Sequence, residues 1–331
     1  LIVLLINLIT TPTFFKISIT NGVLYGYIID VINRASELVV LAVGMTLVVS
    51  ASAGTDISVG AVMAVAAAVC TRVLAGGEVS VNEYANPYVL AVLAALAAAV
   101  VCGGFNGFLV AKLKIQPMVA TLILFTAGRG ISQLVTNGQI TYIRVDGYKL
   151  LGNNIPGIPI PTPIFVAVIV VVLTYILLKK TAMGMYIQSV GINERASRLV
   201  GLKSVKIIWM AYAFCGLCAG IAGLVASSRI YSADANNIGL NMELDAIAAV
   251  ALGGNSLGGG RFSLLGSVIG AYTIQALTTT LYAMSVPADQ IPVYKAIVVI
   301  LIVAVQSEEL KKFRKRLASR HSSKNVEGGV A

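Results

Sequence analysis

Long runs of apolar residues alternate with short polar stretches along most of this 331-residue chain. A helix that crosses a membrane needs about 20 mostly apolar residues. Residues 1–15 are apolar but form a shorter run, and the chain opens without Met. We therefore expect a first span that begins before the first residue of the sequence. Six further runs have the length of a full crossing: residues 88–111, 117–137, 162–179, 205–228, 262–284 and 291–307.

Two other apolar regions are interrupted by glycine-containing stretches. Residues 36–53 and 57–75 flank the tripeptide at 54–56, and residues 242–252 lead into the glycine run at 253–260. Each region reads as a descending helix, a break and an ascending helix, which indicates a weak parallel repeat. Broken helices occur inside membranes only where protein or a water-filled cavity covers the bared backbone. The pattern predicts an all-α polytopic membrane protein with about ten transmembrane helices and two broken-helix regions, whose breaks lie along a translocation route or at a helix crossing.

The composition indicates that lipid is the main solvent of this chain. Hydrophobic residues make up 57% of it and charged residues only 11%, whereas soluble domains have about 45–50% and about 25%. This excludes an ordinary soluble enzyme. The single histidine, His321, excludes a metal site that needs several imidazoles. The basic residues are not interleaved with aromatic residues on a soluble module, so nucleic acid is not an expected partner.

The charges are unevenly placed along the chain. Lys and Arg number 24 against 14 Asp and Glu, which gives a net charge of +10. Six basic residues lie within 179–206 and seven within 306–331, and Lys112 and Lys114 mark a third basic turn. Because Lys and Arg stay on the cytoplasmic side, this pattern predicts that both termini are cytoplasmic. The expected organisation is a transmembrane domain, a cytoplasmic segment inside it and a basic cytoplasmic tail, at residues 1–307, 181–204 and 308–331 respectively.

A few charged residues lie in or beside the expected spans. Asp56 directly precedes an expected helix start, where it can accept backbone N–H bonds as an N-cap or contact a substrate or act in gating. Glu37, Glu243 and Asp245 are interpreted as acids in first helical turns. Arg129 lies well inside a span, where an ion is costly and is by default a functional hypothesis. Its guanidinium can also snorkel or bind the bared carbonyls of a neighbouring break.

Two further motifs have structural explanations. Cys215 and Cys218 form a C-x-x-C spacing in the middle of an expected helix, and we interpret them as small packing residues. The glycine run at 253–260 lacks the Gly-Lys pair of a phosphate-binding P-loop, so we expect it to allow a helix break and close packing. Since the chain has no recognisable nucleotide site, we expect no cofactor on it, and ATP and Mg²⁺ for ATP-driven transport would be bound by another chain.

Residues 191–201 predict a short amphipathic helix at the cytoplasmic side. Asn193 is the candidate N-cap and Gly201 the candidate stop. One face is apolar and the rest is charged, with Ala196, Leu199 and Val200 on the first and Glu194, Arg195 and Arg198 on the second. Such a helix can rest on lipid headgroups or dock into a groove of a cytoplasmic partner, and the residues alone leave both alternatives open.

Several stretches are distinctive when taken together. They are A-V-G-M-T-L-V at 42–48, D-I-S-V-G at 56–60, T-L at 121–122 with R-G at 129–130, residues 191–201, and E-L-D-A-I-A at 243–248 followed by L-G-G-N-S-L-G-G at 252–259. Together they resemble the permease subunit of the ribose and simple-sugar class of bacterial ABC importers. The sequence departs from the family's usual Gly-Gly-Ile-Asp before the first of the two breaks, and Asn255 stands where Thr or Ser is common. Residues 233–237 and 306–307 are most similar to galactofuranose-type permeases.

The resemblance implies a ten-helix permease in the bacterial inner membrane, not an enzyme, that pairs with a second permease subunit, identical or related. It also implies cytoplasmic ATP-binding subunits and a periplasmic sugar-binding protein as partners. The helix that couples to the ATPase would comprise Gly191, Asn193, Glu194, Arg195, Ala196, Arg198, Leu199 and Gly201. The translocation route or its gate would involve Asp56, Ser58, Asn106, Arg129, Asn255 and Ser256. An ion-coupled secondary transporter of a small neutral solute is the alternative, because broken helices are typical of that class too.

Overall fold

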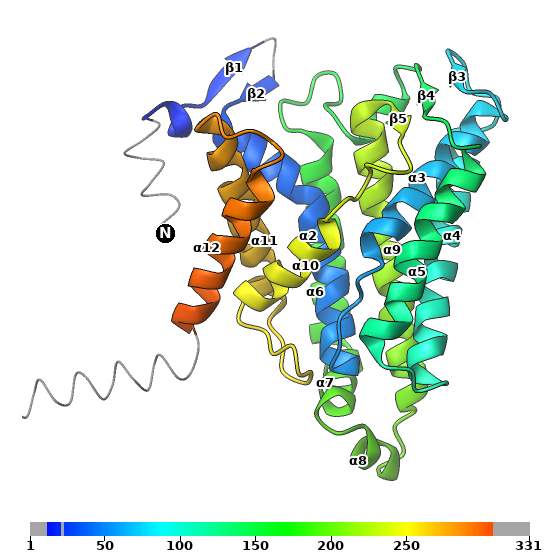
Figure 1. Ribbon diagram of the computed structural model, residues 1–331, viewed down its shortest axis with the longest axis vertical. Coiled ribbons are helices and arrows are strands. Elements are labelled where there is room, and N and C mark those ends of the chain that lie inside the picture. The colour runs from blue at the N-terminus through cyan, green and yellow to red at the C-terminus, as the bar shows by residue number, and fades with distance from the viewer. Residues whose placement is uncertain (1–11, 21–22, 307–331) are drawn as a thin grey trace, which may run out of the picture. The chain divides into compact units, whose positions relative to one another are not determined.

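A computed structural model of the protein describes residues 12–20 and 23–306. These residues form eleven α-helices, two 3₁₀ turns and five short strands (Figure 1). The chain divides into two compact units, Leu1–Thr280 and Leu281–Ala331. Nearly all of the predicted first span at residues 1–15 and the predicted tail at 308–331 lie outside the described residues. The predicted domain boundary therefore stays a prediction.

Six of the described helices are long and apolar enough to cross a membrane. They are α2 (Tyr27–Ser52), α4 (Tyr88–Ala111), α5 (Pro117–Val135), α6 (Thr162–Lys180), α9 (Ser204–Ile230) and α11 (Leu264–Ala283). Two others are apolar but shorter: α3 (Val59–Ala75) and, in the second unit, α12 (Ile291–Gln306). The helix α10 (Met242–Leu252) is shorter still and carries two acids in its first turn. At about 16 Å, α10 crosses only half of a hydrocarbon core about 30 Å thick. The all-α polytopic fold is confirmed in outline, and the count of ten crossings and the orientation stay predictions.

The first interrupted region differs from its prediction. α2 begins at Tyr27, whereas the predicted start was residue 36. Its 26 residues are enough for a complete crossing of about 39 Å, so it is not a half helix. The first break is the short connection at 53–58, where Ala53 turns the chain with a φ of +51°. In the second region, the half-length α10 does end in a glycine-rich turn.

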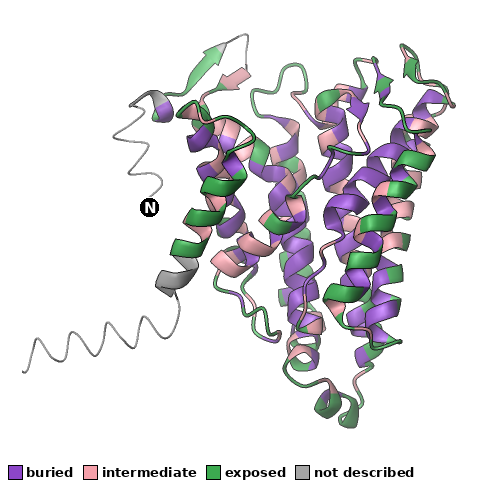
Figure 2. Ribbon diagram, viewed as in Figure 1, coloured by how far each residue is buried: buried purple, intermediate pink, exposed green. Residues whose placement is uncertain are grey.

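α9 is the central helix of the first unit and packs against α2, α3 and α4. Small residues permit the close approach. A Cβ on Gly103 of α4 would lie 2.9 Å from the Cα of Gly216, and one on Gly44 of α2 would lie 3.0 Å from the Cα of Cys215. Cys215 and Cys218 are buried and free, which confirms their interpretation as packing residues. Figure 2 shows that α2 and α3 are buried along most of their length, whereas α4 and α5 expose one side.

Short strands at one end of the first unit were not predicted. β1 (Ser18–Thr20) and β2 (Val23–Tyr25) form an antiparallel hairpin, and β4 (Thr141–Ile143) pairs with β3 (Ser80–Val81) in parallel and with β5 (Ser232–Ala233) in antiparallel orientation. Strands this short give no detectable alternation pattern. We call this end of the unit the strand end. The opposite end, where α7 (Met183–Ile192) and α8 (Glu194–Leu199) lie, is called the α8 end (Figure 1).

Candidate functional site

Asp56, Ser58 and Asn106 meet in one buried group, the Asp56 cluster, where the connection at 53–58 leads into α3. One carboxylate oxygen of Asp56 accepts the backbone N–H of Ser58 at 2.9 Å and its hydroxyl at 2.6 Å. Asn106, near the end of α4, donates its amide to the Ser58 hydroxyl at 2.8 Å and lies 3.4 Å from the same Asp56 oxygen. All three residues are at most 2% exposed. Asp56 therefore organises the turn before α3 and holds it to α4.

Asn255 fixes the glycine-rich turn that follows α10. Its amide donates to the hydroxyl of Ser267 on α11 at 2.8 Å, and its Oδ1 accepts the backbone N–H of Ser263 at 2.5 Å. Ser267 in turn shares a hydrogen bond of 2.6 Å with Thr46 on α2. Asn255 thus connects the turn to two crossing helices. Ser256 is exposed and bonds within its own turn, so the structure does not bring it into this network.

Arg129, on α5, binds the loop between α9 and α10. Its Nη1 donates to the carbonyl oxygens of Ala235 at 3.0 Å and Ile238 at 2.5 Å. The structure thus has this arginine bound to backbone carbonyls, but to those of the α9–α10 loop and not to those of a predicted break. Glu243 and Asp245 lie in the first turn of α10, as expected. Glu243 is only 4% exposed, and its charge attracts that of Arg129.

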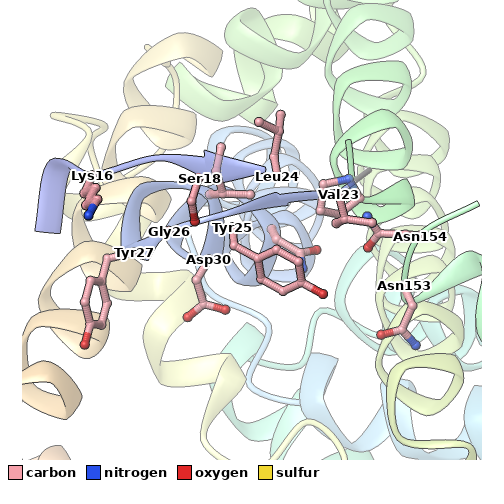
Figure 3. A pocket seen from close by; sticks show the side chains of 13 residues that line it. Lys16, Ser18, Val23, Leu24, Tyr25, Gly26, Tyr27, Asp30, Asn153 and Asn154 are labelled. Carbon is pink, nitrogen blue, oxygen red and sulfur yellow. The ribbon is translucent and has the colours of Figure 1, made fainter. Parts of the chain in front are cut away.

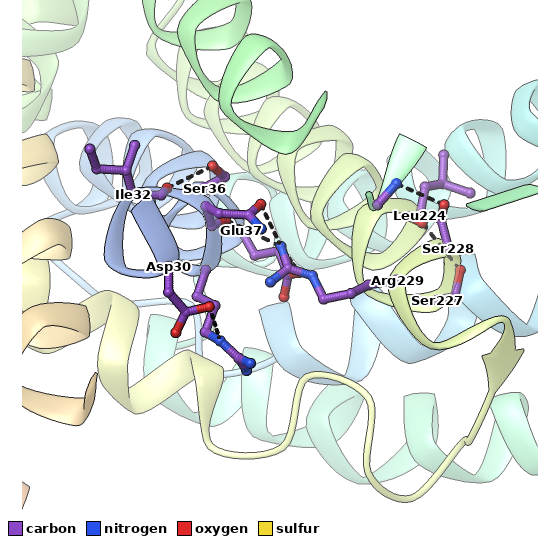
Figure 4. Close-up of polar contacts among 11 residues, drawn as sticks. Asp30, Ile32, Ser36, Glu37, Leu224, Ser227, Ser228 and Arg229 are labelled. Atoms are coloured by element: carbon purple, nitrogen blue, oxygen red, sulfur yellow. Dashed lines mark hydrogen bonds and ion pairs between the residues drawn. The ribbon is translucent and has the colours of Figure 1, made fainter. Parts of the chain in front are cut away.

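The prediction that Glu37 lies in a first helical turn is wrong. Because α2 begins at Tyr27, Glu37 lies well inside the helix. Its carboxylate pairs with Nη2 of Arg229 on α9 at 3.1 Å, and the two side chains are 15% and 19% exposed (Figure 4). Arg229 also donates to the carbonyl oxygen of Asn33 at 3.2 Å. No local sequence signal could have found this pair, since its partners lie far apart along the chain.

A pocket of about 700 Å³ lies at the strand end, between the β1–β2 hairpin, the start of α2 and the segment before α6. Tyr25, Tyr27, Asp30, Asn153 and Asn154 are among its lining residues (Figure 3). The Nδ2 atoms of both asparagines are buried and have no hydrogen-bond partner within the described part of the chain. Amide donors, a carboxylate acceptor and aromatic rings are groups that can bind the hydroxyls of a neutral solute. Sequence reasoning missed this pocket because its lining comes from separate segments.

The predicted amphipathic helix is present as α8 at the end of the bundle (Figure 1). Asn193 caps it by accepting the backbone N–H of Ala196 at 2.9 Å. Gly201 follows it with a φ of +88°, so the helix and both of its boundaries are confirmed. Its exposed side chains are those of Arg195, Ala196, Arg198 and Leu199, with Val200 just beyond. Leu199 and Val200 are 89% and 78% exposed, so the apolar face is open to solvent.

Glu194 anchors the base of α8. It accepts from Lys114, in the connection between α4 and α5, at 2.5 Å and from Arg198 at 2.7 Å. Partial burial raises the pKa of the Glu194 carboxyl, but the hydrogen bond and charge of Lys114, together with Arg198, outweigh it and hold the pKa below its ordinary value. The ion pair therefore fixes α8 against the α4–α5 connection.

Gly191, at the end of α7, touches both interrupted regions. A Cβ at this position would lie 2.6 Å from the backbone nitrogen of Gly260 in the glycine-rich turn, and still closer to the carbonyl oxygen of Ser50 near the end of α2. The N–H of Gly260 donates to that same oxygen at 3.0 Å. The segment that carries α8 is therefore packed, backbone to backbone, against α2 and against the turn after α10.

Long apolar helices, a half-length helix with a glycine-rich turn and a protruding basic segment are the features of a multi-pass membrane protein. Comparison with known proteins gives the family: residues 27–306 match the branched-chain amino acid transport system / permease component family, and the chain belongs to it. It is therefore a permease component and not an enzyme.

Three relatives illustrate the similarity. The chain is 44% identical to the galactofuranose transporter permease protein YtfT of Escherichia coli, over 97% of this chain and 91% of the relative. It is 38% identical to the fructose import permease protein FruF of Bifidobacterium longum, over 94% and 86% of the two chains. It is 34% identical to the ribose import permease protein RbsC of Escherichia coli, over 93% and 92%. No solved structure matches the chain. The relatives confirm the predicted resemblance to permeases of sugar importers.

Proposed function

We propose that this chain is the membrane-spanning subunit of an ATP-driven ABC importer that moves a sugar from the periplasm into the bacterial cytoplasm by alternating access. The three relatives are named for galactofuranose, fructose and ribose. The pocket at the strand end supports a neutral, hydroxyl-rich solute, because its lining offers amides, a carboxylate and tyrosine rings. Galactofuranose, named for the 44% identical relative, is the first candidate substrate.

The observation that carries this proposal is the exposed apolar face of α8. Leu199 and Val200 project into solvent from a helix that the Asn193 cap and the Glu194–Lys114 ion pair hold in place. An exposed apolar face with arginines around it suits a groove on a partner protein. We assign this face to a cytoplasmic ATP-binding subunit, which would bind ATP and Mg²⁺, while this chain binds no cofactor.

The orientation follows from the same assignment. The basic residues at 179–206 and in the tail support a cytoplasmic α8 end with both termini inside, and about ten crossings in the inner membrane. The strand end then faces the periplasm and a sugar-binding protein. A second permease subunit, identical or related, would complete the translocation route.

The candidate route residues support gating more than direct contact with the solute. The Asp56 cluster and Asn255 hold helix ends together near the α8 end, and Arg129 holds the α9–α10 loop near the strand end. Most of their polar groups bind one another or backbone carbonyls, so a solute would have to displace these bonds. Ser256, which is exposed, would lie at the inner mouth of the route.

ATP-dependent sugar uptake by proteoliposomes that contain the permease, its ATP-binding subunit and the sugar-binding protein tests the proposal. Leu199→Glu places a charge on the docking face, and we expect uptake and co-purification of the ATP-binding subunit to fall by more than about tenfold, or 1.4 kcal/mol of binding free energy. Val79→Glu is the matched control for co-purification of the ATP-binding subunit, because Val79 is 43% exposed and lies at the strand end, away from α8. Wild-type uptake and co-purification in Leu199→Glu would overturn the assignment of α8. Uptake that an uncoupler abolishes at constant ATP would favour the ion-coupled alternative.

A further inference from the structure

A groove of about 310 Å³ lies on the outside of the first unit, between the end of α4 and the start of α9. Phe108 and Trp209 form its walls and are 40% and 42% exposed. Two glycines of α4 create the space for the indole. A Cβ on Gly107 would lie 3.1 Å from Cδ1 of Trp209, and one on Gly104 would lie 3.4 Å from Cζ2. The groove is therefore an open hollow with apolar walls, built around the single tryptophan of the sequence.

The rim of this groove is strongly basic. Lys112, Lys203 and Lys206 line it, and no acidic residue does. Nζ of Lys112 lies 5.5 Å from the ring centre of Phe108, which places its ammonium over the apolar wall. The first turn of α9 also begins here without a side-chain cap, so its backbone N–H groups add to the positive potential. Glu194, the acid paired with nearby Lys114, is already neutralised by that pair.

Apolar walls with a cationic rim match one kind of ligand in particular. The walls suit a hydrocarbon chain, and the three ammonium groups and the helix start suit a phosphate. Trp is typical of the membrane–water interface, where its ring sits at headgroup level. A phospholipid combines an apolar chain with an anionic phosphate, and these are the two kinds of group that the walls and the rim of the groove suit.

We propose that this groove binds an anionic phospholipid, with an acyl chain against Phe108 and Trp209 and the phosphate among Lys112, Lys203 and Lys206. The inference rests on the proposed function in one respect, since that places the α8 end at the cytoplasmic leaflet. The bound lipid would stabilise the start of α9, which follows directly on the segment that carries α8 (residues 181–204), here called the coupling segment. The proposed ligand is a lipid and not free phosphate, because free phosphate would leave the apolar walls formed by Phe108 and Trp209 without a contact.

The single tryptophan makes the groove directly observable. The purified protein is placed in liposomes in which a fixed fraction of the lipid is dibrominated, either as phosphatidylglycerol or as phosphatidylcholine, and quenching of Trp209 emission is measured. We expect brominated phosphatidylglycerol to quench more than the same fraction of brominated phosphatidylcholine. Each lysine contributes about fivefold to this preference, so Lys203→Gln with Lys206→Gln should lower it about 25-fold or abolish it. Lys179→Gln with Lys180→Gln removes two charges from the last turn of α6 and should leave it unchanged.

Equal quenching by the two lipids in the wild-type protein would overturn the proposal. So would an equal loss of preference in both double variants, because it would mean that the overall charge attracts the lipid. Relief of quenching by millimolar inorganic phosphate, without any lipid preference, would make the site one for free phosphate and would also overturn it. The measurement needs no transport activity, so it can fail while sugar uptake stands, and uptake can fail while the lipid preference stands.

Discussion

An alanine at position 191 would disturb the closest approach between the coupling segment and the bundle. Its Cβ would lie 2.6 Å from the backbone nitrogen of Gly260 and closer still to the carbonyl oxygen of Ser50, and neither backbone atom can rotate away. Ordinary van der Waals contact begins at 3.4 Å, so α7 must move at least 0.8 Å from the glycine-rich turn. Overpacking of this kind costs about 1–3 kcal/mol. The shift would also strain the hydrogen bond of 3.0 Å between Gly260 and Ser50.

We expect Gly191→Ala to lower the amount of sugar taken up per ATP hydrolysed by about fivefold or more, which corresponds to about 1 kcal/mol. The assay measures uptake and ATP hydrolysis in the same reconstituted complex, together with thermal unfolding of the purified permease. Gly130→Ala on α5 is the matched control, because nothing lies within 4 Å of a Cβ at that position and alanine favours the helix. If Gly191→Ala keeps both the wild-type ratio and the wild-type unfolding temperature, the contact does not couple the two regions.

Three further outcomes follow from the polar contacts. Arg229→Gln leaves Glu37 buried without its charged partner and should cost about 3–5 kcal/mol of stability; thermal unfolding in detergent measures this, and adding Glu37→Gln should recover most of the loss. Asn255→Ala should cost about 1–3 kcal/mol because it removes the hydrogen bonds to Ser267 and Ser263, each worth about 0.5–1.5 kcal/mol, whereas Ser256→Ala, its exposed neighbour, should change stability by less than about 0.5 kcal/mol. Because its pKa is lowered in the folded state, the Glu194 carboxylate stabilises the protein above its ordinary pKa of 4.5, and this contribution disappears as the pH falls through the lowered value. This contribution is below about 1 kcal/mol for so exposed a pair. Glu194→Gln should therefore make the unfolding temperature depend less on pH in the acid range, and an unchanged dependence would contradict the ion pair.

The crossing helices could be predicted because their signal is local. Long, predominantly apolar runs placed α4, α5, α6, α9, α11 and α12 within two residues of their observed ends. The start of α2 could not be found in this way, because Asp30, Arg34 and Glu37 interrupt its apolar pattern. Arg34 pairs with Asp30 at 2.7 Å one turn away, but the ion pair of Glu37 is with Arg229 from α9. A polar residue inside a helix becomes acceptable through a partner that the local sequence does not contain.

The same distinction between local and long-range contacts applies to the candidate site. The Asn193 cap and the Gly201 stop were predictable because each depends on a few neighbouring residues. The bonds from Asn255 through Ser267 to Thr46 were not, because they need α2 and α11 to lie together first. Spacing could place charged and amide groups near the breaks, but only the tertiary structure shows which of them already bind one another.

The packing of α4 on α9 has a mechanical consequence. At Gly103 and Gly216 the two backbones approach each other without an intervening side chain, so a larger residue at either position would push the helices apart. Both helices also reach the coupling segment: α9 directly follows it, and the connection after α4 is paired with it through Lys114. If α8 docks on an ATP-binding subunit as proposed, we expect a force on α8 to reach α4 and α9 together. The relative motion would then lie between this helix pair and its neighbours.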